Sequence, residues 1–164
     1  MVVQSTDTNG LAGDTDLIIR PLNIEDAGTV SAMLLAQPAQ YSRFFFAFDF
    51  NKEQIIDLLK KRVKDVYSGM FWRGELVGIF MLRGWDSGYR VPSFGVFVAE
   101  KFRGGAFMKV SLDIAKLICR LMGAPRLMAK IHPDNVSPRG ASRLGFVQTG
   151  IEIETGNIVY HIDL

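Results

Sequence analysis

VFVAEKFRGGAFM, residues 96–108, is the stretch that decides the fold. An apolar run of strand character ends there in a basic turn with two glycines, and an amphipathic helix begins directly after the turn. Such a turn aims several backbone N–H groups at one point, and the helix macrodipole adds partial positive charge. A phosphate or pyrophosphate can bind at such a point. The alternative is an ordinary strand-to-helix connection, in which the glycines only permit positive φ angles.

Length and composition predict one domain at residues 17–164, preceded by a flexible tail at residues 1–16. The chain has 164 residues, of which 48% are hydrophobic and 22% are charged. Its formal net charge is only +2 and its basic residues are spread along the sequence, which argues against a nucleic-acid partner. No apolar run reaches the roughly 18 residues of a membrane span, and the polar start does not resemble a signal peptide. The single Cys119 cannot form an internal disulfide, so we expect a cytoplasmic protein. Since Cys119 lies in an apolar helical pattern, we expect it to be a core residue rather than a nucleophile.

Strand and helix patterns alternate along the chain and predict a central mixed sheet with helices on its faces. Asn23 and Asn51 are placed to cap two early helices, and Gly74 lies in the turn of a tight hairpin. We expect strands at about 17–20, 70–72, 76–82, 93–99, 126–132, 146–153 and 158–162, and later helices at about 107–122 and 137–144. The fold class is therefore α/β (α+β), with about seven strands and about four flanking helices.

This order of elements, with the residues it carries, resembles the GNAT superfamily of acyl-CoA-dependent N-acyltransferases. Val98, Arg103 and Gly104 match the family's cofactor turn in type and spacing, whereas Ala106 stands where the family has Gly and Met108 where it has Gly or Ala. The second match is the segment 132–137, His-Pro-Asp-Asn-Val-Ser, followed by Leu-Gly-Phe at 144–146. Between Asn135 and Ser137 this segment is one residue shorter than the family's pattern.

The resemblance implies a mostly antiparallel sheet that splays between its fourth and fifth strands, with acetyl-CoA as co-substrate in the gap. The pantetheine arm would pair with backbone groups of the fourth strand, and the pyrophosphate would rest on N–H groups of the turn. The cofactor-binding residues so implied are Phe97, Val98, Arg103, Gly104, Gly105, Ala106, Phe107, Met108, Asn135 and Ser137. An amine would attack the thioester directly, with an N–H near Phe97 stabilising the oxyanion and with no metal.

The general acid and base are less clear, because the two usual positions carry other residues. The tyrosine position of the family's fourth helix is Ala141 here, and a common glutamate position is Ser93. We therefore take Asp86 as the candidate base and Tyr160 as the candidate acid. The alternatives are a turn-forming aspartate and a packing tyrosine in a strand. The two histidines, at 132 and 161, are expected to be structural, and their spacing does not resemble a metal site.

The stretch 81–95 looks like one found in a GNAT subset that we associate with bacterial surface-polysaccharide pathways, where amino sugars are acylated. Trp85 and Tyr89 could stack on a sugar or base, and the aromatic segment 41–50 would form the opposite wall. We therefore expect acetyl transfer to a small-molecule amine such as an amino sugar. A protein amine as acceptor and a non-catalytic CoA-binding module are the alternatives, and a homodimer is left open. A P-loop would need Lys and Ser or Thr after the glycines, and no Rossmann glycine motif follows the first strand.

Overall fold

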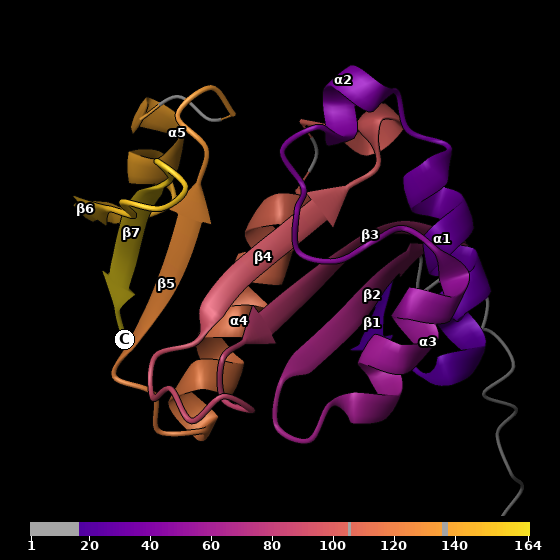
Figure 1. Cartoon of the computed structure of the whole chain (residues 1–164), viewed down its shortest axis with the longest axis horizontal. Helices are drawn as coiled ribbons and strands as arrows, with labels where there is room; N and C mark the ends of the chain where they lie inside the picture. The colour runs from indigo at the N-terminus through magenta and orange to yellow at the C-terminus, as the bar shows by residue number, and fades with distance from the viewer. Residues whose placement is uncertain (1–16, 105, 136–137) are drawn as a thin grey trace, which may run out of the picture.

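A seven-stranded mixed sheet forms the centre of the computed structural model, which describes residues 17–104, 106–135 and 138–164 (Figure 1). The strands are β1 (Leu17–Pro21), β2 (Val66–Trp72), β3 (Glu75–Arg83), β4 (Ser93–Val98), β5 (Arg126–Ile131), β6 (Val147–Ile151) and β7 (Ile158–Asp163). Their order in the sheet is β1-β2-β3-β4-β5-β7-β6, and only the β4–β5 pair is parallel. The predicted mixed, mostly antiparallel sheet is confirmed. The predicted tail at residues 1–16, Gly105 and Ser137 lie outside the described residues.

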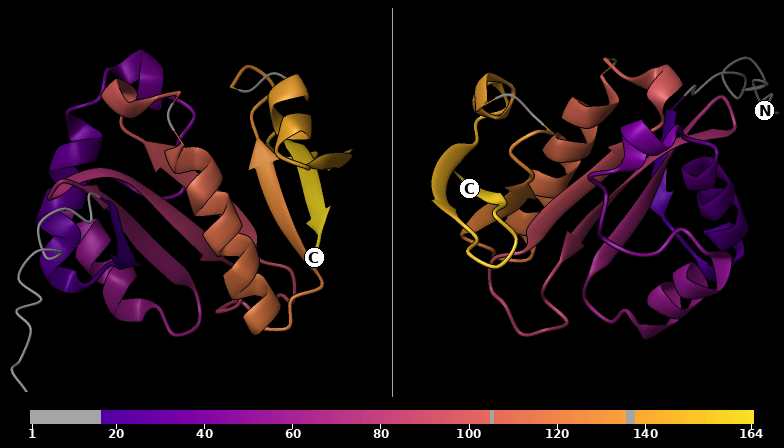
Figure 2. Two further views of the ribbon diagram at one scale, coloured as in Figure 1. Left: turned by 180° about the vertical axis from the view of Figure 1, so that it is seen from behind. Right: turned by 45° about the horizontal axis from the view of Figure 1, so that its top comes forward.

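Helices cover both faces of this sheet (Figure 2). They are α1 (Ala27–Leu35), α2 (Ala39–Ser42), α3 (Lys52–Lys61), α4 (Phe107–Leu121) and α5 (Pro138–Arg143), with two short 3₁₀ turns, η1 (Ile24–Asp26) and η2 (Glu100–Phe102). α1 and α3 lie on one face, and α4 crosses the other. Within the described residues, no helix has the length and apolar character that a membrane crossing requires.

The local signals of the sequence act where they were expected. The Asn51 side chain accepts a hydrogen bond from the Glu53 N–H at 2.8 Å and so caps α3. Asn23 caps η1 in the same way and accepts from the Asp26 N–H at 3.1 Å. Positive φ angles of 50° and 79° at Arg73 and Gly74 form the tight turn between β2 and β3.

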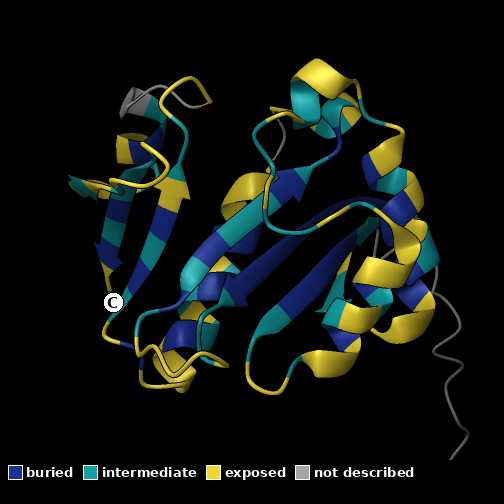
Figure 3. Cartoon of the chain, in the orientation of Figure 1, coloured by how far each residue is buried: buried dark blue, intermediate teal, exposed yellow. Residues whose placement is uncertain are grey.

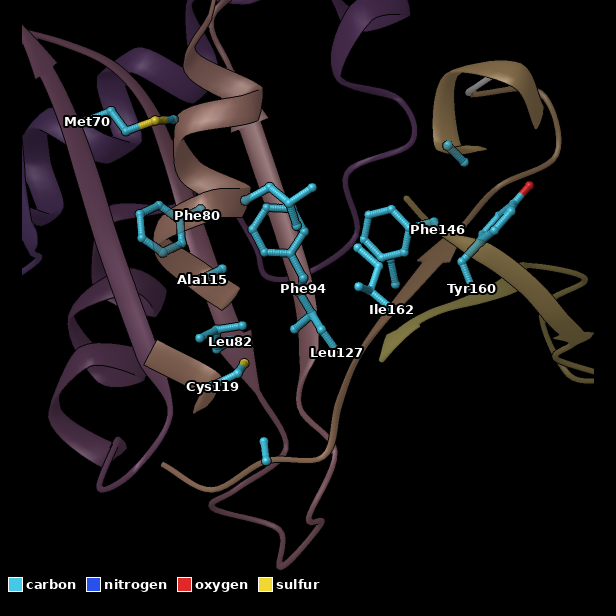
Figure 4. Close-up of a cluster of buried hydrophobic side chains, with 14 of the residues drawn as sticks. Met70, Phe80, Leu82, Phe94, Ala115, Cys119, Leu127, Phe146, Tyr160 and Ile162 are labelled. Carbon is cyan, nitrogen blue, oxygen red and sulfur yellow. The ribbon is translucent and has the colours of Figure 1, made fainter. Parts of the chain in front are cut away.

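Two apolar clusters, one on each face, hold the layers together. β3 is buried along nearly its whole length and contributes alternate side chains to both clusters (Figure 3). Phe80 and Leu82 pack beneath α4 with Ala115 and Cys119 (Figure 4), whereas Met81 belongs to the cluster beneath α1 and α3. Burial raises the pKa of the Cys119 thiol to about 11, which agrees with a core residue rather than a nucleophile.

The sheet opens between its two parallel strands. β4 and β5 pair only where Ser93 meets Met128, and the Met128 N–H donates to the Pro92 carbonyl oxygen at 3.0 Å. Beyond this point the two strands diverge, although β5 pairs with β7 from Arg126 to Ile131. The predicted splay between the fourth and fifth strands is therefore present, and it leaves one edge of β4 unpaired along most of its length.

Candidate active site

A cavity of about 760 Å³ lies where β4 and β5 part. Its volume is in the range of small-molecule sites. β4 forms one wall and the end of β5 forms another, and the turn after β4 lies at one end of the cavity. The turn contributes Arg103, Gly104 and Met108, and the segment that follows α1 contributes Tyr41, Phe44, Phe45, Phe46 and Ala47. This segment extends from the turn, where Tyr41 bonds to Val98, to Arg83, which bonds to Ala47. The expected second wall of aromatic residues is thus in place.

The backbone of β4 presents alternate residues to this cavity. The Ala99 N–H donates to the Val77 carbonyl oxygen at 2.8 Å, and the Phe97 carbonyl oxygen lies against Gly78 of β3. In an antiparallel ladder every second residue exchanges both of its hydrogen bonds with the same neighbour. Phe97 therefore faces β3, while the N–H groups of Val96 and Val98 face the opening. The donors near Phe97 that the site can use are therefore the N–H groups of its two neighbours, because the phase of the alternation is set by the register with β3.

The turn after β4 has the features of an anion site. Gly104 has a φ of +80°, and the first helical hydrogen bond of α4 runs from the Val110 N–H to the Ala106 carbonyl oxygen at 2.9 Å. The N–H groups of Phe107 and Met108 precede that bond and so have no partner within the helix. The macrodipole of the 15-residue helix adds positive charge at the same end.

The side chains of this turn divide between cavity and core. Arg103, Gly104 and Met108 line the cavity, and Arg103 forms no ion pair among the described residues. The ring of Phe107 instead packs edge-on against Trp72 and Phe102, with centroids 6.0 and 5.9 Å apart. Only backbone groups of Phe107 are therefore available to a ligand.

Tyr41 is a residue that the sequence analysis placed in the aromatic wall without giving it a chemical role. Its hydroxyl donates a 2.7 Å hydrogen bond to the Val98 carbonyl oxygen, across 57 residues of sequence. Its ring packs edge-on against Phe97 at 5.7 Å, and the Arg103 guanidinium lies 5.9 Å from the ring centroid. Burial raises the pKa of the Tyr41 hydroxyl, so that the hydroxyl keeps its proton at neutral pH. The cavity thus contains a protonated tyrosine that touches β4.

His132 lies on the opposite wall, at the end of β5. Its ring stacks on Phe44 with centroids 4.7 Å apart, and its Nδ1 accepts a hydrogen bond from the Asp134 N–H at 3.2 Å. A neutral imidazole that accepts at Nδ1 carries its proton on Nε2. Asn135 lines the cavity beside it, and its N–H donates to the His132 carbonyl oxygen at 2.9 Å. Ala141, where the family usually has tyrosine, also lines the cavity and supplies no acid.

Asp86 lies outside the described lining of the cavity. Its two carboxylate oxygens accept hydrogen bonds from the Val63 and Lys64 N–H groups, at 3.0 and 2.6 Å. These N–H groups lower the pKa of the Asp86 carboxyl. The contacts fit the turn-forming alternative, because the side chain connects the β3–β4 loop to the α3–β2 loop.

Three other expected site residues also lie outside that lining. Trp85 packs against the core beneath α4, and Tyr89 is 68% exposed in the β3–β4 loop. Tyr160 is buried, and its ring packs edge-on against Phe146 at 6.4 Å (Figure 4). The packing alternative accounts for these contacts of Tyr160. The structure therefore brings the expected cofactor turn to the cavity but not the expected acid, base or stacking residues.

The electrostatic character of the cavity is cationic. Arg83, Arg103 and Lys130 line it, and no aspartate or glutamate is found among its described lining residues. Lys130 is paired with Glu152, which lies outside that lining. In the part of the chain that the structure describes, no group of three or more His, Cys, Asp or Glu side chains could hold a metal ion.

A match between the sequence and a family model identifies the family of the chain. The family model of the acetyltransferase (GNAT) domain matches residues 16–147, which includes the open β4–β5 pair and the cofactor turn. The chain belongs to the GNAT acetyltransferase family. No curated protein sequence matches it significantly.

Solved structures share the GNAT fold at low sequence identity. A domain from Methanocaldococcus jannaschii superposes with a TM-score of 0.76 at 19% identity, covering 92% of this chain and 100% of that one. The PaiA N-acetyltransferase from Thermoplasma acidophilum, crystallised with coenzyme A, gives a TM-score of 0.72 at 14% identity, covering 90% and 99%. An acetyltransferase from Salmonella typhimurium that modifies the N-terminal serine of a 50S ribosomal subunit protein gives 0.75 at 17%, covering 92% and 96%. These likenesses establish the fold of this GNAT domain.

Proposed function

We propose that this GNAT acetyltransferase moves an acetyl group from acetyl-CoA to the primary amine of a small molecule of the amino-sugar type. The observation that carries the proposal is the opening of the sheet beyond Ser93 and Met128 into a cavity of about 760 Å³. The unpaired edge of β4 can hydrogen-bond an extended amide chain as an added strand would. The pantetheine arm of CoA has that form.

The residues at the end of the cavity next to the cofactor turn suit the charged part of CoA. Arg103 is free of ion pairs among the described residues, and the first N–H groups of α4 are available to a pyrophosphate. Val96 and Val98 supply the N–H groups of β4 that face the opening. Gly104 places the turn in a conformation that other residues rarely adopt, and Asn135 supplies polar groups from the β5 side. Gly105, Ala106 and Ser137 remain cofactor contacts within this proposal.

The chemistry needs no covalent enzyme intermediate. The neutral amine nitrogen attacks the thioester carbonyl carbon, so that a C–N bond forms and the C–S bond breaks. The amine loses one proton, and the departing CoA thiolate gains one. An N–H of Val96 or Val98 stabilises the oxyanion, and one such donor contributes ~2.7–4 kcal/mol in studied enzymes. Holding both reactants in one cavity can supply roughly 7–11 kcal/mol more.

Tyr41 is the group we assign to protonate the thiolate. Its hydroxyl lies on the Val98 carbonyl oxygen, beside the edge of β4 that would pair with the pantetheine arm. The raised pKa of Tyr41 keeps the hydroxyl protonated over the working pH range. His132, with its proton on Nε2, is the second donor in the cavity. The amine proton passes to water, since none of the described lining residues is a carboxylate and nearby cations lower the pKa of an ammonium group.

The aromatic wall and the sequence support the proposed acceptor class. The Phe44–Ala47 segment encloses the acceptor side of the cavity, which suits a small ligand with an apolar face. The stretch 81–95 adds the likeness to the amino-sugar subset. The second candidate is a protein N-terminal amine, because solved structures with the same fold include acetyltransferases that modify ribosomal proteins, such as the Salmonella typhimurium enzyme.

A turnover assay distinguishes an amino-sugar acceptor from a protein acceptor and from a CoA-binding module. Release of free thiol from acetyl-CoA is followed with a panel of amino sugars and with peptides that begin with serine or alanine. We expect turnover with an amino sugar and at least a tenfold lower kcat/KM with the peptides. Turnover with peptides alone would assign a protein acceptor. CoA binding by calorimetry without turnover on any amine would indicate a binding module.

A further inference from the structure

Arg83 occupies the end of the cavity farthest from the cofactor turn. It is the last residue of β3 and lies two residues after Met81, so both side chains point to the face that carries α1 and α3. Its Nη1 donates a 2.6 Å hydrogen bond to the Ala47 carbonyl oxygen, and both residues line the cavity. The guanidinium is therefore placed beside the aromatic wall on the acceptor side.

The position of Arg83 excludes a role in binding the pyrophosphate. Arg83 pairs with Ser93, at the start of β4, whereas the cofactor turn follows Val98 at the other end of that strand. Five residue steps of about 3.3 Å separate the two ends by roughly 16 Å. A CoA pyrophosphate at the turn is therefore out of reach, and the groups that Arg83 can meet belong to the acceptor.

Arg83 also donates a side-chain hydrogen bond to the Tyr67 hydroxyl, which leaves its charge without a paired carboxylate in the described part of the chain. It forms no ion pair among the described residues, and its cross-strand neighbour Ser93 is neutral. The acids of the nearby loops accept backbone hydrogen bonds: Asp65 accepts from Gly84 and Asp86, and Asp86 accepts from the α3–β2 loop. The Arg83 charge therefore disfavours a simple cationic amine at this end of the cavity and attracts an anion.

We propose that Arg83 binds an oxyanion, a phosphate or a carboxylate, carried by the acceptor itself, so that the substrate is an anionic small amine. This inference rests on the function proposed above and narrows its acceptor. The planar guanidinium fork matches a phosphate or carboxylate with two parallel hydrogen bonds, while the bond to Ala47 keeps the side chain in place. The same positive charge lowers the pKa of an amine held nearby, which favours the neutral, nucleophilic form.

Three sugars that differ at one position provide the test: glucosamine, glucosamine 6-phosphate and 2-amino-2-deoxyglucuronate. The kcat/KM of each is measured for the wild type, Arg83→Gln and Arg83→Lys. Arg90→Gln is the matched control, because Arg90 is exposed in the adjacent loop and lies outside the described lining. Calorimetry of each sugar with CoA-loaded protein gives a readout that does not depend on turnover.

We expect the wild type to prefer one of the two anionic sugars over glucosamine by at least tenfold, and the preferred one identifies phosphate or carboxylate. Arg83→Gln should bring that ratio to within twofold of unity, and Arg83→Lys should keep only part of it. The Kd of CoA should be unchanged in all variants. Equal use and equal binding of the three sugars by the wild type would overturn the inference, as would a preference that survives in Arg83→Gln. If no sugar is acetylated, the proposed function fails, and the calorimetric comparison still decides the role of Arg83.

Discussion

Reversing the charge of Arg103 should weaken CoA binding strongly while leaving the fold intact. A charge-assisted hydrogen bond to a phosphate contributes about 1.5–3 kcal/mol. A carboxylate about 4 Å from a phosphate charge in water adds a repulsion of about 1 kcal/mol. The sum, about 2.5–4 kcal/mol, corresponds to a roughly 60- to 700-fold increase in the Kd of CoA for Arg103→Glu.

The cost in folding stability is much smaller, because the exposed Arg103 side chain makes only a ring contact with Tyr41 at 5.9 Å. Such a contact contributes about 0.5–1 kcal/mol at an exposed site, so the Tm should fall by about 1–4 °C. Titration calorimetry with CoA measures the Kd, and Arg90→Glu serves as a control with the same change in net charge. An unchanged Kd in folded Arg103→Glu would refute the assignment of the turn to the pyrophosphate.

Three further outcomes test other parts of the account. Tyr41→Phe removes the hydroxyl on the Val98 carbonyl oxygen and should lower the rate of thiol release by about a hundredfold or more if Tyr41 is the acid; a wild-type rate would exclude that role. Two backbone N–H groups lower the pKa of Asp86, so its stabilisation is present above its ordinary pKa near 4 and is lost as the pH falls through the lowered value. Asp86→Asn should therefore lower the Tm at pH 7 but leave it unchanged at a pH below the lowered pKa, with turnover within twofold of the wild type; a hundredfold loss of rate would support Asp86 as the base. Cys119, with a pKa of about 11, should resist iodoacetamide at pH 8 in the folded protein and react in urea, as followed by mass spectrometry.

The fold was predictable because its signals are local. Asn51 caps a helix within three residues, and Gly74 sets a turn within a hairpin. The cofactor turn from Arg103 to Met108 is likewise one contiguous segment, so its anion-binding character can be recognised without knowing the packing around it. Elements of this kind can be predicted from residues that are close together in the sequence.

The rest of the site depends on contacts between distant segments. Tyr41 reaches Val98 across 57 residues, and Arg83 reaches Ala47 across 36. Neither contact could be predicted, because the spacing of these residues in the sequence gives no sign of it. Asp86 shows a related ambiguity, since an aspartate in a polar loop looks the same in the sequence whether it accepts from backbone N–H groups or from a substrate.

Which N–H groups of β4 face the opening could not be predicted from the sequence, for a related reason. Alternation along a strand predicts that every second N–H faces the opening, but the phase depends on the register with β3. A shift of one residue exchanges Phe97 for Val96 and Val98.

A crystal structure of the protein with bound CoA tests the central claim, that the opening between β4 and β5 holds the thioester end of acetyl-CoA. The account predicts the pyrophosphate on the turn at residues 103–108, beside Arg103. It also predicts pantetheine amides paired with backbone groups of Val96 or Val98, and the sulfur atom in the cavity. CoA bound elsewhere, with the opening between β4 and β5 empty, would contradict it.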